Sequence, residues 1–155
     1  MDLQTFGRMA EAIAPDVIAH RRRFHANPEL FWKERETTLF IEKTLREMNY
    51  ENIRVGFGGG DTGVTADLNS HLPGPCIAIR ADIDALPLEE EADVPFRSTV
   101  KGVMHACGHD AHAAILLGVA SVLSKVKEDL PGKVRLIFQP AEESGLNSGA
   151  KHMIA

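Results

Sequence analysis

The chain has 155 residues, and its apolar content of 44% and charged content of 25% lie in the range of ordinary globular proteins. Its formal net charge of −5 argues against nucleic acid as the main partner, because phosphate binding depends on clustered Lys and Arg. No apolar stretch approaches the ~20 residues that cross a bilayer, and the N-terminus lacks a signal-peptide pattern, so we expect no membrane partner and a cytoplasmic protein.

The N-terminal third of the chain predicts three helices. Apolar residues recur every three or four positions in residues 3–14 and 17–27, which predicts two helices that meet near Pro15. Residues 21–23 are all arginine, and a solvated helix face explains them better than a binding patch. A third helix is predicted over residues 33–48. Its buried face is expected to carry Leu39, Phe40, Leu45 and Met48.

Four strands are predicted in the remainder. Residues 54–57 and 63–69 predict two strands, and the glycine-rich loop at 58–61 is favoured as a hairpin connection, because a phosphate-binding loop needs another glycine spacing and a following helix. Compact apolar runs predict a buried strand at residues 76–80 and a further strand at 133–138.

The strongest helical pattern covers residues 112–127 and ends before Pro131. Because helices and strands alternate, the sequence predicts an α/β fold in which helices pack on a largely buried mixed sheet. Residues 147–155 begin a helical pattern that has no closing cap, from which we expect the chain to be a truncated part of a longer protein. Two cysteines, Cys76 and Cys107, could form a disulfide, but free thiols are favoured without a secretion signal.

Polar residues gather where the predicted strands end, which is where open α/β sheets build their sites. Residues 104–112 read Met-His-Ala-Cys-Gly-His-Asp-Ala-His, and imidazole together with thiolate suits zinc and similar ions. Gly108 would let Cys107 and His109 face one point, and His112 follows one helical turn later. The alternative is a helix start with capping or packing histidines, but a metal site is favoured for so dense a cluster.

Two acidic pairs follow predicted strands. Beyond Pro140 the backbone need not stay extended, so Glu142 and Glu143 could reach one site, one as a metal ligand and the other as a proton acceptor. Taken alone, an exposed acidic pair would be the better interpretation. Asp82 and Asp84 would share one face of a strand end, which suits a ligand or a partner that orients a histidine. Capping of a loop explains this pair almost as well.

Four stretches together resemble the family of metal-dependent amidohydrolases that includes hippurate hydrolases, N-acyl-amino-acid hydrolases and plant auxin-conjugate hydrolases. They occur in the family's order across nearly the whole chain, and the last two are the specific ones. They are residues 23–30 (RFHANPEL), 80–87 (RADIDALP), 104–110 (MHACGHD) with His112, and 138–143 (FQPAEE). The chain departs modestly from the family at residues 144–150, where a glycine-rich run is usual.

The resemblance implies a role for each site residue. Cys107, His109 and Glu143 would bind metal, Glu142 would be the general base, and Asp84 would be a supporting residue near the metals. His25 and Glu29 would shape the structure near the site. The implied activity of the full enzyme is hydrolysis of the amide bond of N-acyl amino acids with two divalent ions (Zn, Mn or Co).

Members of this family are more than twice as long as this chain. The resemblance therefore implies that residues 1–155 form the N-terminal part of a zinc-exopeptidase-like catalytic domain. Two further histidine ligands, a lid and dimerisation domain and the C-terminal catalytic segment would be absent. The fragment could then bind one metal or none, and a non-catalytic metal-binding or assembly module is the alternative. Exposed strand edges lead us to expect self-association as a homo-oligomer.

Overall fold

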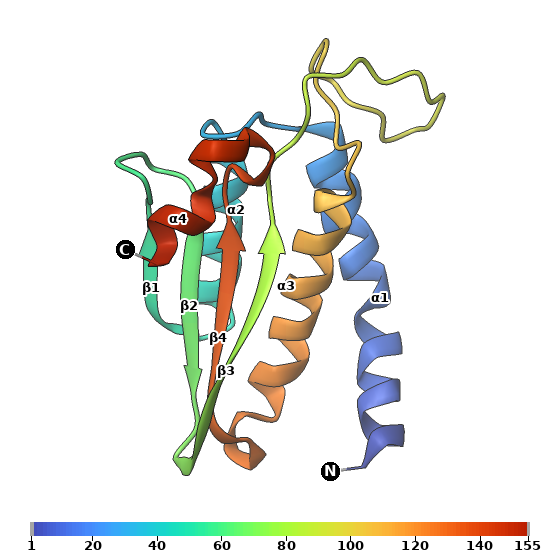
Figure 1. Cartoon of the computed structure of the whole chain (residues 1–155). Helices are drawn as coiled ribbons and strands as arrows, with labels where there is room; N and C mark the ends of the chain where they lie inside the picture. Colours follow the sequence, from blue (N-terminus) through green and yellow to red (C-terminus); the bar gives the residue numbers. More distant parts are fainter. Residues whose placement is uncertain (1, 155) are drawn as a thin grey trace.

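A four-stranded mixed sheet lies at the centre of the structure, a computed structural model that describes residues 2–154 (Figure 1). The strand order is β1-β2-β4-β3, in which β2 is antiparallel to both its neighbours and β3 is parallel to β4. The strands are β1 (Glu51–Val55), β2 (Val64–Asn69), β3 (Leu72–Asp82) and β4 (Pro131–Gln139). This mixed sheet with packed helices confirms the expected fold class.

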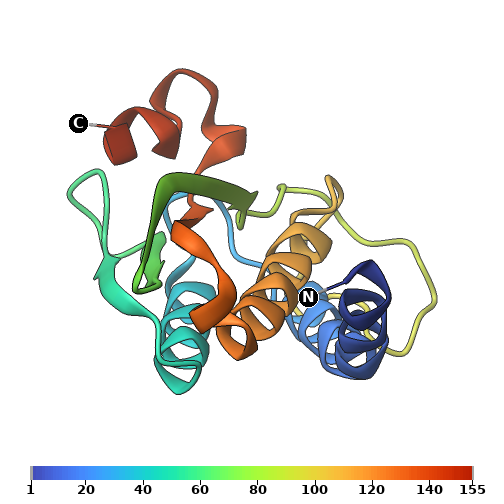
Figure 2. The ribbon, with the colours of Figure 1, turned by 90° about the horizontal axis from the view of Figure 1, so that it is seen from below.

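Three long helices cover one side of the sheet (Figure 2). They are α1 (Leu3–Ala26), α2 (Arg35–Glu47) and α3 (His109–Lys125). Helices α2 and α3 lie against the strands, and α1 packs on the outer side of α3. The short helices are η1 (Lys127–Asp129), η2 (Glu142–Asn147) and α4 (Gly149–Ile154), and α4 lies on the other side of the sheet. Within residues 2–154, no helix has the length and apolar character required to cross a membrane.

The core lies between these helices and the inner face of the sheet. The inward side chains of the two central strands are each no more than 2% exposed. They are Val64, Ala66 and Leu68 of β2 and Leu136 and Phe138 of β4. Full burial of a Val, Leu or Phe side chain stabilises a fold by roughly 1.5–3 kcal/mol, so these two strands anchor the helix layer.

Helix α1 runs without a break through Pro15, which corrects the prediction of two helices that meet there. A proline removes one backbone hydrogen bond, but Pro15 and Glu11, one turn earlier, are both exposed, so water can satisfy the freed carbonyl. The apolar face continues across the proline to pack on α3. Gly118 of α3 permits a close approach, because a Cβ atom there would lie 2.6 Å from Cγ2 of Val17.

The strand predicted at residues 76–80 is present within β3, but it is not buried. Ile77 is 57% exposed. Strand β3 lies at an edge of the sheet and pairs only with β4 among the described residues. A compact apolar run is equally typical of a central strand and of an edge strand, so the sequence could not distinguish the two positions.

The buried face of α2 also differs from the prediction. Leu39 is 55% exposed, whereas Leu45 is fully buried as expected. The residues that α2 buries are Thr37, Thr38, Ile41, Thr44 and Leu45. Phe40 and Met48 are partly buried and pack against the core, as predicted, so only Leu39 was placed wrongly, and the three buried threonines were missed by a pattern read from apolar residues alone.

Several element boundaries shift as well. Strand β1 covers Glu51–Val55 rather than residues 54–57, and it ends there because Gly56 turns the chain with a φ of +86°. The segment that follows connects β1 to β2 as a hairpin, as predicted, and N–H of Gly56 donates to the carbonyl of Gly63 at 3.3 Å. Helix α3 begins at His109 rather than at residue 112, which places His109 in its first turn.

A long loop, called the excursion below, connects β3 to α3 and extends beyond the end of the sheet (Figure 1). Leu86 and Met104 close it with two backbone hydrogen bonds, at 3.0 Å and 3.1 Å. Residues 87–103 therefore form a loop whose two ends are held together next to the segment that carries Cys107.

Candidate metal centre

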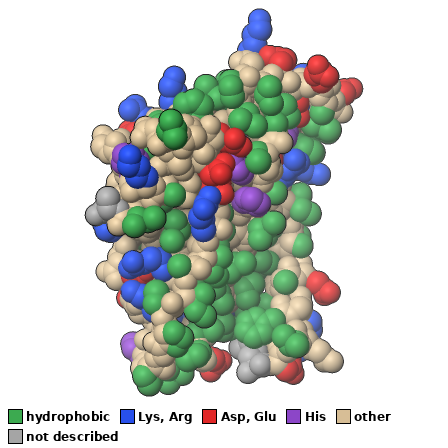
Figure 3. All heavy atoms as spheres, in the orientation of Figure 1, with side chains coloured by type: hydrophobic (Ala, Val, Ile, Leu, Met, Phe, Trp, Pro, Cys, Tyr) green, Lys and Arg blue, Asp and Glu red, His purple; other side chains and the backbone are tan. Residues whose placement is uncertain are grey.

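Three polar segments meet beyond the carboxyl ends of the parallel strands β3 and β4. Asp84 follows β3, Glu142 and Glu143 follow β4, and Cys107 and His109 lie at the start of α3. The carboxyl ends of parallel strands are where α/β sheets place their ligand sites. In Figure 3, acidic and histidine side chains gather at the surface over this end of the sheet.

One atom each from Cys107, His109 and Glu143 lies within 4.8 Å of the other two, so these residues could hold a metal ion. Gly108 adopts a left-handed conformation, with φ +83°, which turns Cys107 and His109 toward one point. Asp82, His109 and His112 form a second group with the same spacing. The carboxylate of Asp82 already accepts a hydrogen bond from Arg80, whose Nη2 lies 2.7 Å from Oδ1. We therefore favour the first group as the metal site.

Asp84 fixes the orientation of the His109 ring. Nδ1 of His109 lies 3.0 Å from the backbone carbonyl of Asp84 and 3.1 Å from its Oδ1. The other nitrogen, Nε2, is 4.0 Å from Oε2 of Glu142. Burial alone would lower the pKa of His109, but the hydrogen bonds and negative charge of Asp84 raise it to about 9. A cation at this site would therefore displace a proton from Nε2.

The thiol of Cys107 is held in its protonated form by the carboxylates around it. A hydrogen bond to Glu143 raises the pKa of Cys107 most, followed by burial and by the charges of Glu143, Glu142 and Asp82. A bound divalent cation would offset this negative charge and ionise the thiol. Thiolate, imidazole and carboxylate form a donor set that zinc accepts, so the residues present fit a metal.

The backbone before the two glutamates has an unusual turn that directs their side chains. Ala141 has φ +52°, and its N–H donates to Oε1 of Glu34 at 2.7 Å. The N–H of Glu143 donates to Oδ2 of Asp84 at 2.8 Å. Glu34 is fully buried, and burial raises its pKa to about 7. Sequence reasoning missed Glu34, whose only local signal is its place just before a helix.

His25 and Glu29 contribute to the scaffold around the site, as the resemblance implied. Both carboxylate oxygens of Glu29 accept backbone N–H groups at the start of α2, from Glu36 at 3.1 Å and Thr37 at 2.8 Å.

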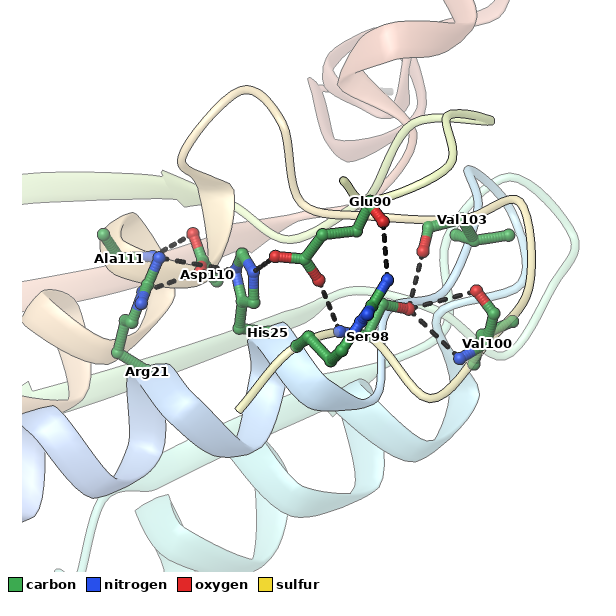
Figure 4. A network of polar contacts seen from close by, with 9 residues as sticks. Arg21, His25, Glu90, Ser98, Val100, Val103, Asp110 and Ala111 are labelled. Atoms are coloured by element: carbon green, nitrogen blue, oxygen red, sulfur yellow. Dashed lines mark hydrogen bonds and ion pairs between the residues drawn. The ribbon is translucent and has the colours of Figure 1, made fainter. Parts of the chain in front are cut away.

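His25 lies between two buried carboxylates, 2.6 Å from Oδ2 of Asp110 and 2.9 Å from Oε1 of Glu90 (Figure 4). The network of His25 links three separate parts of the fold (Figure 4). Glu90 belongs to the excursion and also accepts the N–H of Ser98, whereas Asp110 belongs to the first turn of α3. Arg21 of α1 adds an ion pair of 2.9 Å with Asp110. Arg22 and Arg23 are exposed, as a solvated helix face predicts, whereas Arg21 is partly buried by this ion pair.

Three further histidines differ in their surroundings. His112 is exposed, and its ring stacks on that of His109 with centroids 5.7 Å apart. His105 is buried, neither of its ring nitrogens has a hydrogen-bond partner among the described residues, and burial lowers its pKa to about 4. His152 contacts Asn147 at 3.0 Å and belongs to neither group of potential metal ligands. The described residues contain no disulfide, and Cys76 and Cys107 are both exposed.

Comparison with known proteins places this geometry in a family. N-acetyl-L-cysteine deacetylase of Bacillus subtilis is 50% identical over 89% of this chain and 32% of its own length. Thermostable carboxypeptidase 2 of Saccharolobus solfataricus is 51% identical over 89% of this chain and 35% of its own length. The chain thus spans about a third of the length of these curated relatives.

A solved structure and a family model agree with these relatives. A dinuclear metal binding peptidase from the M20 family of Bacillus subtilis superimposes with a TM-score of 0.85 at 45% identity. The match covers 93% of this chain and 39% of that one. The model of peptidase family M20/M25/M40 matches residues 78–155, half of the chain. The chain therefore belongs to peptidase family M20/M25/M40.

Proposed function

We propose that this chain supplies one side of a two-metal centre in an enzyme that hydrolyses the amide bond of N-acyl amino acids. The observation that carries the proposal is the convergence of Cys107, His109 and Glu143 within 4.8 Å, with Glu142 beside them. The relatives named N-acetyl-L-cysteine deacetylase and dinuclear metal binding peptidase support the reaction and the number of metals. Residues 1–155 would then be the N-terminal part of the catalytic domain.

The proposed roles follow from the contacts of each side chain. Divalent cations bound here would polarise the amide carbonyl and lower the pKa of an attacking water. Cys107, His109 and Glu143 would hold them, and Asp84 would keep the His109 ring in place through Nδ1. The side chain of Glu142 is 40% exposed and is free to accept a proton from water and to pass it to the leaving amine.

The test compares two glutamate-to-glutamine variants in a longer purified protein that contains this chain together with the remaining parts of the proposed catalytic domain. Glu142→Gln should abolish hydrolysis of N-acyl amino acids such as N-acetylcysteine but leave the content of zinc, manganese or cobalt nearly intact. Glu143→Gln should lower the metal content itself. If the Glu142 variant lost its metal and the Glu143 variant kept it, the two roles would be reversed.

A metal-binding or assembly module without turnover is the second candidate, because only three donors converge in the favoured group of the described residues. Metal binding without hydrolysis of any member of an N-acyl amino acid panel, by a longer wild-type protein that contains this chain, would favour it. We further propose a cytoplasmic location, which the unbridged cysteines support, and a homo-oligomer built on the exposed edge of β3. Light scattering that shows a monomer at high concentration would contradict the oligomer.

A further inference from the structure

Two buried carboxylates hold the backbone on either side of Glu142. Oε1 of Glu34, at the start of α2, accepts the N–H of Ala141 at 2.7 Å. Oδ2 of Asp84, beyond β3, accepts the N–H of Glu143 at 2.8 Å. Both carboxylates are no more than 1% exposed, so water does not compete for these hydrogen bonds.

The turn that they hold is one that the chain would not adopt by itself. A left-handed conformation is unfavourable for a residue other than glycine, because Cβ approaches the following carbonyl oxygen, and Ala141 has φ +52° and ψ +42°. The turn is also tightly enclosed. A Cβ atom on Gly63 would lie 2.6 Å from Cδ of Pro140, and one on Gly149 would lie 2.0 Å from the carbonyl oxygen of Pro140. The surrounding contacts therefore determine which way the next two side chains point.

We propose that Glu34 is a positioning residue of the hydrolytic site, which acts with Asp84 as a clamp on the backbone of residues 141–143. The clamp turns Glu143 toward Cys107 and His109 and leaves Glu142 unengaged beside them. This assignment rests on the proposed function for the roles of the two glutamates, whereas the clamp itself rests on the hydrogen bonds described above.

The clamp needs an acceptor oxygen at Glu34 rather than a negative charge. Oε2 of Glu34 is buried and has no hydrogen-bond partner among the described residues, which disfavours the ionised form. A neutral carboxyl retains a carbonyl oxygen that can accept the N–H of Ala141, and so does the amide of glutamine. Glu34→Gln should therefore preserve the clamp, whereas Glu34→Ala and Glu34→Leu should remove it.

The deciding experiment is hydrogen exchange at the amide of Ala141, measured by NMR in the metal-free protein. Glu36→Ala, at an exposed position of the same helix, is the control. We expect wild type, Glu34→Gln and Glu36→Ala to protect this amide alike, and Glu34→Ala to exchange it at least about tenfold faster. Glu34→Leu retains volume and replaces Glu34→Ala if the smaller side chain prevents folding.

A cobalt titration adds a second measurement, because thiolate-to-cobalt absorption reports the site around Cys107. Loss of the clamp should weaken cobalt binding by about 10–100-fold, as is typical when a supporting contact of a metal ligand is removed. Unchanged Ala141 exchange in Glu34→Ala or Glu34→Leu would overturn the proposal, and so would equal losses in the Gln and Ala variants. A longer wild-type protein that contains this chain and the remaining parts of the proposed catalytic domain, protects Ala141 and yet hydrolyses no N-acyl amino acid would refute the proposed function and still support the clamp.

Discussion

Asp84 contacts His109 twice through the same ring nitrogen, with Nδ1 3.0 Å from the backbone carbonyl and 3.1 Å from the carboxylate. The same carboxylate accepts the N–H of Glu143 through its other oxygen. One buried side chain thus sets the orientation of two of the three proposed metal ligands, although it lies far from both in the sequence.

Replacing Asp84 by Asn should lower the pKa of His109 from about 9 toward its ordinary value of 6.5, because the charge that favours the imidazolium is lost. An NMR titration of the His109 ring in metal-free protein measures this change. Asp129→Asn, an exposed carboxylate on η1, should leave the titration unaltered. A pKa that stays near 9 in the Asp84 variant would show that another group sustains it.

Replacing Glu34 by Gln should stabilise the protein at neutral pH. Folding raises the pKa of Glu34 from 4.5 to about 7, so its stabilising contribution is complete below pH 4.5 and is lost as pH rises through 7. The Gln variant has no such loss and should exceed wild type by at most about 3 kcal/mol at pH 8. Urea unfolding of both proteins between pH 4.5 and 8 tests this, and a difference that does not grow with pH would contradict it.

Replacing His25 by Ala should destabilise the fold, because it leaves the carboxylates of Asp110 and Glu90 buried without their shared partner. Removal of one member of a buried ion pair costs roughly 3–5 kcal/mol, which urea unfolding would detect. The excursion should also become more sensitive to limited proteolysis, since Glu90 anchors it. His20→Ala, on the same helix but only partly buried, is the matched control and should have the smaller effect.

Two glycine-to-alanine substitutions should change stability in opposite directions. A Cβ on Gly149 would lie 2.0 Å from the carbonyl oxygen of Pro140, so Gly149→Ala must displace the turn and should destabilise by roughly 1–3 kcal/mol. Gly7 lies in α1, where a Cβ would have no atom within 4 Å, and Gly7→Ala should stabilise by up to about 1 kcal/mol. Thermal unfolding should show a lower melting temperature than wild type for Gly149→Ala and a higher one for Gly7→Ala.

The local motifs predicted that Cys107 and His109 face one point and that the two glutamates after β4 could reach the same site, and the family resemblance implied that Glu143 is the one that joins them. The sequence did not reveal Glu34 or Glu90, since these residues act across 107 and 65 positions of chain and carry no local pattern. The edge position of β3 was equally hidden, because an apolar run reports the composition of a strand and not the number of its neighbours. The predicted helix break at Pro15 was wrong for a related reason, since the packing of α1 on α3 outweighs the one hydrogen bond that the proline removes.

The backbone pair between Leu86 and Met104 separates the length of the excursion from the position of the ligands that follow it. Since the loop is closed before residue 105, extra residues at its exposed part, 91–93, would enlarge the loop without moving Cys107. Doubling a loop costs only about 0.6 kcal/mol of closure entropy. This segment is therefore a place where the chain can gain or change recognition surface while the proposed metal centre stays fixed.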